Sequence, residues 1–363
     1  MHRALILALG TALCAVPLAA VAADAKAPMT KAPPAAAFKA PKNAFGQPDL
    51  SGFWTNATLT PMTRSPSVGG RQTYTPEEVK KLESAVVAEV EEGNKPTDPN
   101  APAEAPKRDA ANTRPEFAAA GGDVGGYNRG WLDPGSTIMR VHGEPRTSLI
   151  TTANGMPPAR KTGAGGGGGG GRGGLGGFDN PEQRSMGERC ILSFGRNAGP
   201  PMFPNGFYNN NYQLLQTPDS VLIEVEMVHD LRVVRLNAKH RSDDVRPYMG
   251  DAIGWWDGDT LVVETTHIPA TQQFMGSWKD LKVTERFTRV GKTRLHYAFQ
   301  VEDAGFWDKP WGGEYEFSPM ETGILYEYAC HEGNYALPGM LAGARQQEKD
   351  AKAGPAPKPG AAE

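Results

Sequence analysis

The sequence lacks an excess of charge of either sign and has only three cysteines. Its 363 residues contain 38 Lys plus Arg against 41 Asp plus Glu, so the formal net charge is -3. Proteins that bind nucleic acid usually carry a basic surface that neutralises phosphates, so this balance argues against nucleic acid as a partner. The 44 Gly and 31 Pro interrupt regular structure often enough to exclude a coiled coil or a protein built of long helices.

The sequence also lacks the short motifs that mark common enzyme classes. It contains no zinc-ligand spacing, no P-loop, no dinucleotide-binding glycine motif and no Gly-x-Ser-x-Gly. The stretch 163–177 has 12 Gly in 15 positions, but it follows no apolar strand and lacks the Gly-Lys-Ser/Thr ending of phosphate-binding loops. We therefore expect neither a metal nor a cofactor, and we interpret this stretch as a flexible insertion.

The longest apolar run is confined to the N-terminus. Residues 1–23 have a basic start at Arg3, an apolar stretch, and small residues before a cleavage site near Ala22 or Ala23. This is the layout of a secretory signal peptide, and the apolar run is short for a membrane span. We predict a periplasmic or secreted protein with no stable membrane insertion after cleavage; an uncleaved anchor is the alternative.

Two cysteines remain once the leader, which contains Cys14, is removed. An even pair in an exported chain most simply forms a disulfide, because exported proteins meet an oxidising environment. We therefore predict a bridge between Cys190 and Cys330. The alternative is a reactive thiol at Cys330, which is followed by His331 and Glu332.

Segments rich in Gly and Pro divide the chain. Residues 24–48 form an Ala/Pro/Lys linker, residues 93–115 a polar insertion, and residues 346–363 an Ala/Pro/Lys/Gly tail. None of these, nor 163–177, has enough apolar residues to offset the entropy lost on ordering, so we expect them to be disordered or flexible. The remaining chain between 49 and 345 has a length that suits a single domain.

Hydrophobic periodicity predicts a mainly β domain. One helix is expected between Thr75 and Gly93, where Thr75 and Glu78 form a capping box. From residue 210 onward the period is two, and the expected strands are 212–216, 221–228, 231–236, 253–256, 261–266, 281–290, 293–302, 314–317 and 324–330. Short connectors indicate antiparallel neighbours, and so many strands most simply close their edges. We predict an antiparallel meander that closes into a lipocalin-like barrel, with one or two flanking helices and long loops.

Five sequence blocks stand out along this domain. They are Gly187–Cys190, Tyr208–Gln213, Glu226–Asp230, Trp256–Thr265 and Tyr328–Tyr335. These blocks resemble those of a large secreted family of soil proteobacteria and acidobacteria, most of whose members are uncharacterised. The resemblance covers about 49–345, and it implies a periplasmic address and an environmental substrate.

Ionisable residues at the expected strand ends are the candidates for catalysis. In one interpretation, His229 is a general base that the Asp230 carboxylate orients, near the cation of Arg232. In the other, His229 and Asp230 form a solvated turn. His331 follows the expected disulfide and is held rigidly there, either for catalysis or as a structural corner. On the expected meander, the turn at His229 shares a rim with the start of the strand that contains His296.

We assign catalytic roles to His229, His331, Tyr212 and Arg232. The residues expected to bind substrate are Asn211, His296, Glu332, Tyr335 and Trp256. The polar face of the strand 293–302, which carries His296, is expected outside the barrel; an inward orientation would favour an enzyme, and an outward one a binding protein.

The most concrete function is an exported, cofactor-independent lyase. It would remove a small fragment such as formaldehyde from an aromatic, lignin-derived molecule by acid/base elimination. The alternatives are a periplasmic lipocalin-like binding protein for an apolar ligand and a glycan-active protein. The expected partner is a small-molecule substrate, and the oligomeric state, monomer or homodimer, stays open.

Overall fold

The computed structural model describes residues 38–93, 133–163, 177–194, 197–206 and 208–353. The chain divides into Met1–Ala35, which lies outside the described residues, and Ala36–Glu363, which contains the barrel. The predicted signal peptide and almost all of the two predicted insertions also lie outside the described residues.

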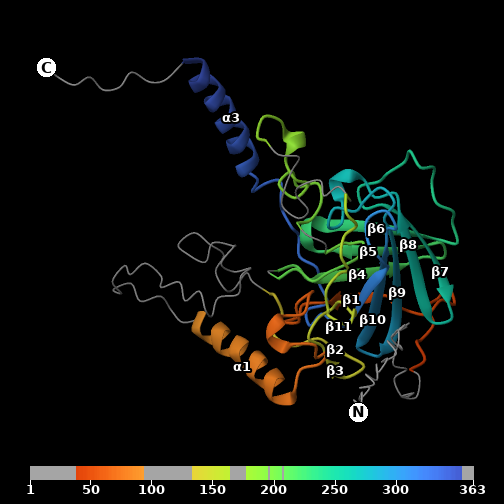
Figure 1. Ribbon diagram of the computed structural model, residues 1–363. Helices are drawn as coiled ribbons and strands as arrows, with labels where there is room; N and C mark the ends of the chain where they lie inside the picture. The colour runs from red at the N-terminus through yellow and green to blue at the C-terminus, as the bar shows by residue number, and fades with distance from the viewer. Residues whose placement is uncertain (1–37, 94–132, 164–176, 195–196, 207, 354–363) are drawn as a thin grey trace, which may run out of the picture. The chain divides into compact units, whose positions relative to one another are not determined.

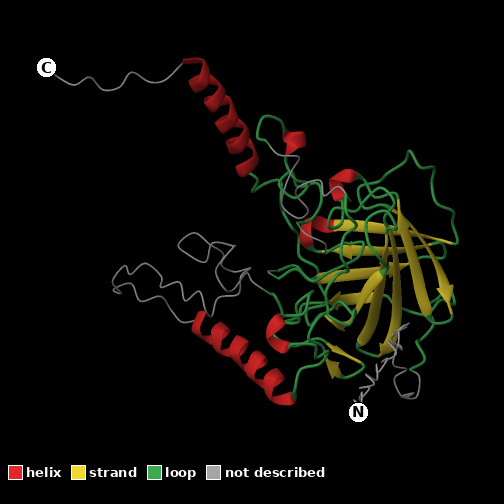
Figure 2. Cartoon of the chain, in the orientation of Figure 1, coloured by secondary structure: helices red, strands yellow, loops and turns green. Residues whose placement is uncertain are grey.

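Nine strands close into a barrel in the order β1-β11-β10-β9-β8-β7-β6-β5-β4 (Figures 1 and 2). The predicted mainly β barrel is therefore confirmed. The strands are β1 (Gly52–Thr55), β4 (Asn211–Gln216), β5 (Ser220–Val225), β6 (Asp230–Leu236), β7 (Asp251–Asp257), β8 (Thr260–Thr266), β9 (Lys282–Gly291), β10 (Arg294–Glu302) and β11 (Trp311–Pro319). A separate hairpin pairs β2 (Arg140–Val141) with β3 (Glu144–Pro145). The segment expected as a strand at 324–330 forms none.

One pair of neighbouring strands departs from the predicted meander. β6 and β7 run parallel and are joined by the pairs Arg235–Ile253 and Leu236–Gly254. The connector 237–250 returns the chain from one end of the barrel to the other, whereas the predicted meander would have made these two strands antiparallel. Every later strand therefore runs opposite to the expected direction, so His229 lies at one rim and the start of β10 at the other. The predicted shared rim is wrong for this reason.

The barrel interior is filled by aromatic and aliphatic side chains. In β10, Leu295, Tyr297, Phe299 and Val301 are buried, whereas the alternate residues face outward and are exposed or half-buried. The ring of Tyr297 lies 4.8 Å from that of Tyr315 and 5.0 Å from that of Phe287 between centroids. These rings occupy the space in which a lipocalin-like barrel would hold its ligand.

Among the described residues, two α-helices accompany the barrel, α1 (Pro76–Gly93) and α3 (Ala336–Ala353) (Figure 2). The predicted capping box of α1 is present, because Glu78 N donates to Thr75 Oγ1 at 3.2 Å and Thr75 N donates to Glu78 Oε2 at 2.8 Å. Helix α3 includes residues that were expected to begin the disordered tail. Short 3-10 helices are η1 (Pro66–Val68), η3 (Pro181–Gln183), η4 (Met227–His229) and η5 (Ala270–Gln272).

The described part of the expected linker is also folded. Asn43 Oδ1 accepts the backbone N–H groups of Phe45 and Gln47 at 2.9 and 3.0 Å, which closes a tight turn. Gln47 Nε2 then donates to the carbonyl of Thr217 at 3.0 Å, so this turn is attached to the β4–β5 connection. Among the described residues, no helix has both the length and the apolar character needed to cross a bilayer.

Candidate functional site

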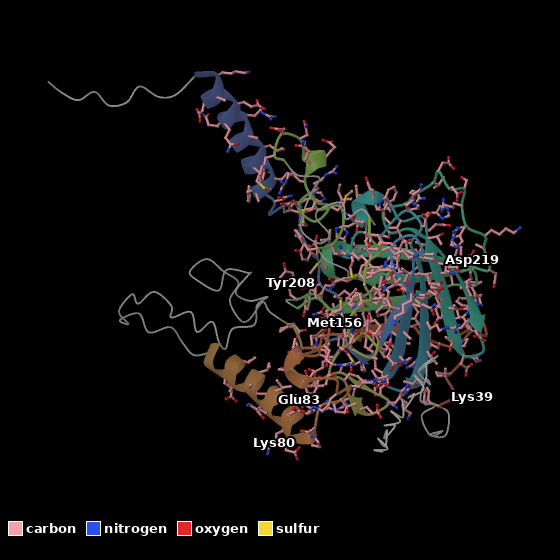
Figure 3. The ribbon with its side chains drawn as sticks, in the orientation of Figure 1. Lys39, Lys80, Glu83, Met156, Tyr208 and Asp219 are labelled. Atoms are coloured by element: carbon pink, nitrogen blue, oxygen red, sulfur yellow. A yellow bond between two sulfur atoms is a disulfide. The ribbon has the colours of Figure 1, made fainter. Side chains whose placement is uncertain are left out.

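Four of the five sequence blocks meet at one rim of the barrel, where β4 starts, β5 ends and β6 starts. We call this end the β6 rim. Tyr208, just before β4, lies near this end, and Asp219, in the β4–β5 turn, lies at the other (Figure 3). Asn211 Nδ2 donates to Glu226 Oε2 at 2.6 Å, and Asn334 Nδ2 donates to the carbonyl of Glu188 at 2.8 Å. These two hydrogen bonds join the four blocks in two pairs within the same region of the rim.

The predicted disulfide is part of this region. Cys190 and Cys330 are bonded, with their Cα atoms 5.7 Å apart, so the bridge is confirmed and the alternative of a free thiol at Cys330 is excluded. The bridge fastens the turn that carries His331 to the segment before β4. That segment continues to Ser193, whose backbone N–H donates to Asp230 Oδ2 at 2.9 Å.

His229 and Asp230 lie in the turn between β5 and β6. Val228 and His229 have φ values of 57° and 46°, a left-handed backbone that turns the chain sharply and leaves His229 exposed. Asp230 is 5 % exposed. Burial raises the pKa of the Asp230 carboxyl to about 6, although hydrogen bonds from Ser193 and the charge of His229 act in the opposite direction. A buried carboxyl that titrates near neutral pH therefore stands beside an exposed imidazole.

Arg232 lies deeper, inside the barrel. Its Nη1 donates to Glu285 Oε1 at 3.1 Å and to the carbonyl of Ala198 at 2.9 Å, while its Nη2 contacts Glu285 Oε2. Burial disfavours the charged guanidinium, but the adjacent Glu285 carboxylate raises the pKa of Arg232 above its usual value. The Tyr297 hydroxyl donates to the same carboxylate at 2.8 Å and accepts the backbone N–H of Met202 at 2.9 Å.

Tyr212 extends this buried network. Its hydroxyl donates to the carbonyl of Asn197 at 3.0 Å and accepts from Asn56 Nδ2 at 3.1 Å, and burial raises its pKa. Tyr212 and Arg232 therefore both bind backbone carbonyls of the segment 197–202. Both side chains serve to hold that segment against the interior of the barrel.

A groove of about 330 Å³ lies beside β6, where β6 and the segment before β7 are not paired. Its walls include Leu231, Val233 and Tyr248, which are 49, 48 and 49 % exposed. Leu192 also lines the groove and directly precedes Ser193, the hydrogen-bond partner of Asp230. This wall of the groove is therefore apolar, and its residue Leu231 directly follows the His229–Asp230 pair in the chain.

The other wall of the groove carries charge. Asp251 Oδ1 accepts from Arg235 Nη2 at 2.8 Å and from Arg241 Nε at 3.2 Å. Burial alone would raise the pKa of Asp251, but the hydrogen bonds from Arg241, His240 and Arg235 lower it below its usual value. Two guanidinium groups against one carboxylate give this wall a net positive charge, which favours an anionic ligand.

The remaining predicted residues are spread over the molecule. Asn211 lies at the β6 rim, half-buried against Glu226. His331 and Glu332 are exposed in the turn after the disulfide, and Tyr335 is 82 % exposed. Trp256 is half-buried near the opposite end of β7, and His296 lies on the outer face of β10. The structure thus gathers Asn211, His229, Tyr212 and Arg232 near one rim and places Trp256 and His296 elsewhere.

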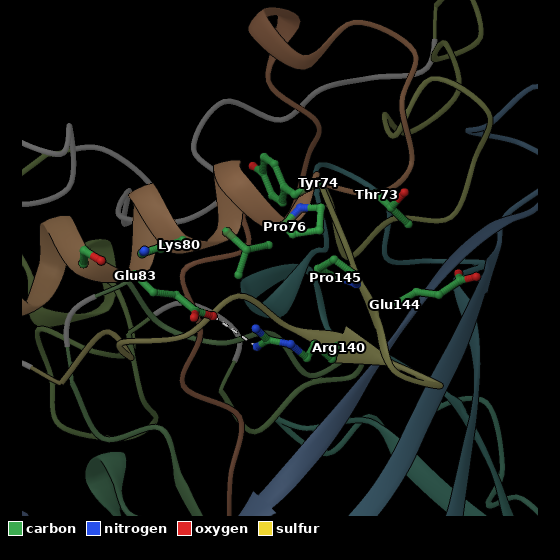
Figure 4. Close-up of a pocket in the computed structure, with 10 residues that line it drawn as sticks. Thr73, Tyr74, Pro76, Lys80, Glu83, Arg140, Glu144 and Pro145 are labelled. Atoms are coloured by element: carbon green, nitrogen blue, oxygen red, sulfur yellow. Dashed lines mark hydrogen bonds and ion pairs between the residues drawn. The ribbon is translucent and has the colours of Figure 1, made fainter.

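A larger hollow, of about 580 Å³, lies between α1 and the β2–β3 hairpin (Figure 4). Two of its charged residues are paired with each other, because Glu83 Oε1 accepts from Arg140 Nη1 at 3.0 Å; the same oxygen accepts the backbone N–H of Ile138 at 3.0 Å. None of the five sequence blocks contributes to its lining. None of the blocks lines the groove beside β6 either, but its lining residues Leu192 and Leu231 directly adjoin Ser193 and Asp230, so we place the candidate site there.

Sequence reasoning missed the groove residues Arg235, Arg241, Tyr248 and Asp251. Three of them belong to, or directly follow, the connector 237–250, whose flanking strands the predicted meander made antiparallel. Its length was the available signal, since a parallel connection needs a dozen or more residues.

Comparisons with family models, with curated proteins and with solved structures found no match. The function is therefore inferred from the geometry of this chain alone.

Proposed function

We propose that the protein is an exported lyase that acts on a small aromatic acid in the groove beside β6, with Asp230 and His229 as its acid/base pair. One observation carries this proposal. A carboxyl with a pKa of about 6 stands next to an exposed histidine, and the residue that follows them, Leu231, lines a groove with one apolar and one positively charged wall. A general base is most effective when its pKa lies near the working pH, and Asp230 meets that condition.

The lining of the groove supports the choice of substrate. Leu231, Val233 and Tyr248 present half-exposed apolar surface, which suits an aromatic ring. Arg235 and Arg241 outnumber Asp251, which suits a carboxylate or phenolate on that ring. The Cys190–Cys330 bridge supports export, because such bonds persist in oxidising compartments.

The proposed reaction is an elimination that releases formaldehyde. Asp230, ionised at neutral pH, takes the hydroxyl proton of a –CH2OH group on the substrate. The adjacent C–C bond breaks, formaldehyde leaves, and the electron pair of that bond forms a C=C bond. The oxygen substituent on the neighbouring carbon departs with a proton from His229, so charge and atoms balance without an oxidant or reductant.

The test is turnover of lignin-derived aromatic acids that carry a hydroxymethyl group. Formaldehyde is trapped and quantified, and the second product is identified by mass spectrometry. We expect Asp230→Asn to lower kcat by at least about 100-fold and His229→Gln by about 10- to 100-fold, the range typical of general acid/base groups. Asp257→Asn, at the opposite end of the barrel, is the matched control and should keep the wild-type rate.

Three outcomes would contradict the proposal. Full activity in both Asp230→Asn and His229→Gln would exclude the acid/base pair, and loss of activity in His331→Gln alone would move the site to the turn after the disulfide. An aromatic acid that binds, is recovered unchanged and loses affinity in Arg241→Gln would instead identify a binding protein.

A further inference from the structure

Two histidines and a carboxylate meet on the outer face of the barrel, at β10 and β11. His296 Nε2 lies 3.2 Å from Glu314 Oε2, and the ring of His142 stacks on that of His296 with 5.2 Å between centroids. One ligand atom from each residue lies within 4.8 Å of the other two. The three residues come from the β2–β3 turn, β10 and β11, so the tertiary fold alone brings them together.

Strand register fixes two of the three side chains. His296 pairs directly with Glu316, so Glu314 is its diagonal neighbour on the same face of the sheet. The third side chain, His142, sits in an exposed turn with φ 53°, and its backbone N–H donates to Glu316 Oε1 at 2.9 Å. A fixed pair thus faces one side chain on a turn, where the ring has room to rotate.

Hydrogen bonds outside this cluster orient the carboxylate. Glu314 Oε1 accepts from Arg146 Nη2 at 2.5 Å, which leaves Oε2 toward His296. Metal ligands in proteins are usually held by such outer hydrogen bonds.

A second cluster, His240, Asp251 and His267, has similar spacing but different surroundings. Its carboxylate is already bound by the guanidinium groups of Arg235 and Arg241. His240 Nε2 lies 3.2 Å from Glu264 Oε1, and His267 Nε2 lies 3.0 Å from Asp243 Oδ1. Two guanidinium groups bind this carboxylate, whereas only that of Arg146 binds Glu314, so the second cluster is less suited to a metal and serves as an internal control.

We propose that His142, His296 and Glu314 bind one divalent transition-metal ion such as Zn²⁺ or Co²⁺. Two imidazoles and one carboxylate are the protein ligands of open zinc sites, in which solvent completes the coordination. Ligand atoms in a tetrahedral site lie about 3.3 Å apart, so rotation of the His142 ring must bring its nitrogen closer by roughly 1–1.5 Å. With neutral histidines, the carboxylates of Glu144, Glu314 and Glu316 outnumber Arg146 and Arg294, which also favours a cation.

The test is a titration of the untagged, disulfide-intact chain with Co²⁺, followed by its visible d–d absorption, and with Zn²⁺ by calorimetry. We expect one ion per chain. His142→Ala, His296→Ala and Glu314→Gln should each weaken binding at least about tenfold, whereas His240→Ala and His267→Ala should leave it unchanged. His142→Ala is decisive because the residue is exposed on a turn, so its removal does not disturb the core; circular dichroism verifies folding.

Three results would overturn the site. They are no stoichiometric binding to the wild type, wild-type affinity in His142→Ala and Glu314→Gln, or loss of binding in His240→Ala instead. The titration needs no substrate, so its outcome is independent of the proposed lyase activity.

Discussion

The buried ion pair between Arg232 and Glu285 should govern the stability of the barrel interior. The two side chains are 1 and 0 % exposed. Glu285→Gln keeps the shape of the side chain and an oxygen for the Tyr297 hydroxyl, but it leaves the guanidinium without a counter-charge in a site closed to water. We expect the free energy of unfolding to fall by about 3–5 kcal/mol, the usual cost of breaking a buried pair from one side.

Removing both charges should cost less. In Arg232→Met combined with Glu285→Leu, the desolvation of both ions disappears together with their attraction, so we expect the free energy of unfolding to lie within about 2 kcal/mol of the wild type. The assay is urea unfolding followed by tryptophan fluorescence with the disulfide intact. The control is Asp257→Asn, which breaks the exposed ion pair between Asp257 and Arg286. These two side chains are 67 and 50 % exposed. We expect this variant to change the free energy of unfolding by less than about 1 kcal/mol. A Glu285→Gln variant as stable as the wild type, or simple additivity of the two single changes, would refute this reasoning.

Three further predictions concern the fold and the rim. Cys330→Ser should lower the free energy of unfolding by about 4–5 kcal/mol on the chain-entropy model, since the bridge spans 140 residues, and a loss below about 2 kcal/mol would count against it. Gly312→Ala places a Cβ 2.1 Å from the Phe299 carbonyl oxygen. We expect Gly312→Ala to lower the free energy of unfolding by at least about 2 kcal/mol. Gly258→Ala, whose added Cβ meets no neighbouring atom, should lower it by about 1 kcal/mol. Because burial raises the pKa of Asp230 from 3.8 to about 6, its ionisation destabilises the folded state as pH rises through that window. The wild type should therefore lose up to about 3 kcal/mol relative to Asp230→Asn between about pH 4 and 7. If the difference in unfolding free energy between the wild type and Asp230→Asn does not vary with pH, the raised pKa of Asp230 is contradicted.

The barrel and the disulfide were predictable because their signals are local or compositional. Strands such as β10 show clean alternation, which indicates one buried face, and an exported chain with two cysteines left has one simple pairing. The strand expected at 324–330 did not form, although its composition favours one. In that segment the Tyr326 backbone N–H donates to the carboxylate of Glu226 at 3.1 Å, so this N–H binds a side chain and not a neighbouring strand.

The site was less predictable, because it depends on the parallel step between β6 and β7. That step changes which rim each later strand end reaches, and it places Arg241 and Tyr248 beside Leu231. The cluster of His142, His296 and Glu314 likewise has no local spacing motif, because a turn and two strands supply one residue each. In both cases the chemistry follows from tertiary register, which periodicity alone does not fix.

The most direct measurement of the proposed chemistry is the pH dependence of kcat/KM for an aromatic acid that the protein turns over. With Asp230 as the base, kcat/KM should rise with pH through a midpoint near 6, the pKa of its carboxyl. Asp230→Asn should lie at least about 100-fold lower across the range. A flat profile between about pH 5 and 8, or an Asp230→Asn variant that keeps the wild-type profile, would contradict the assignment of Asp230 as the catalytic base.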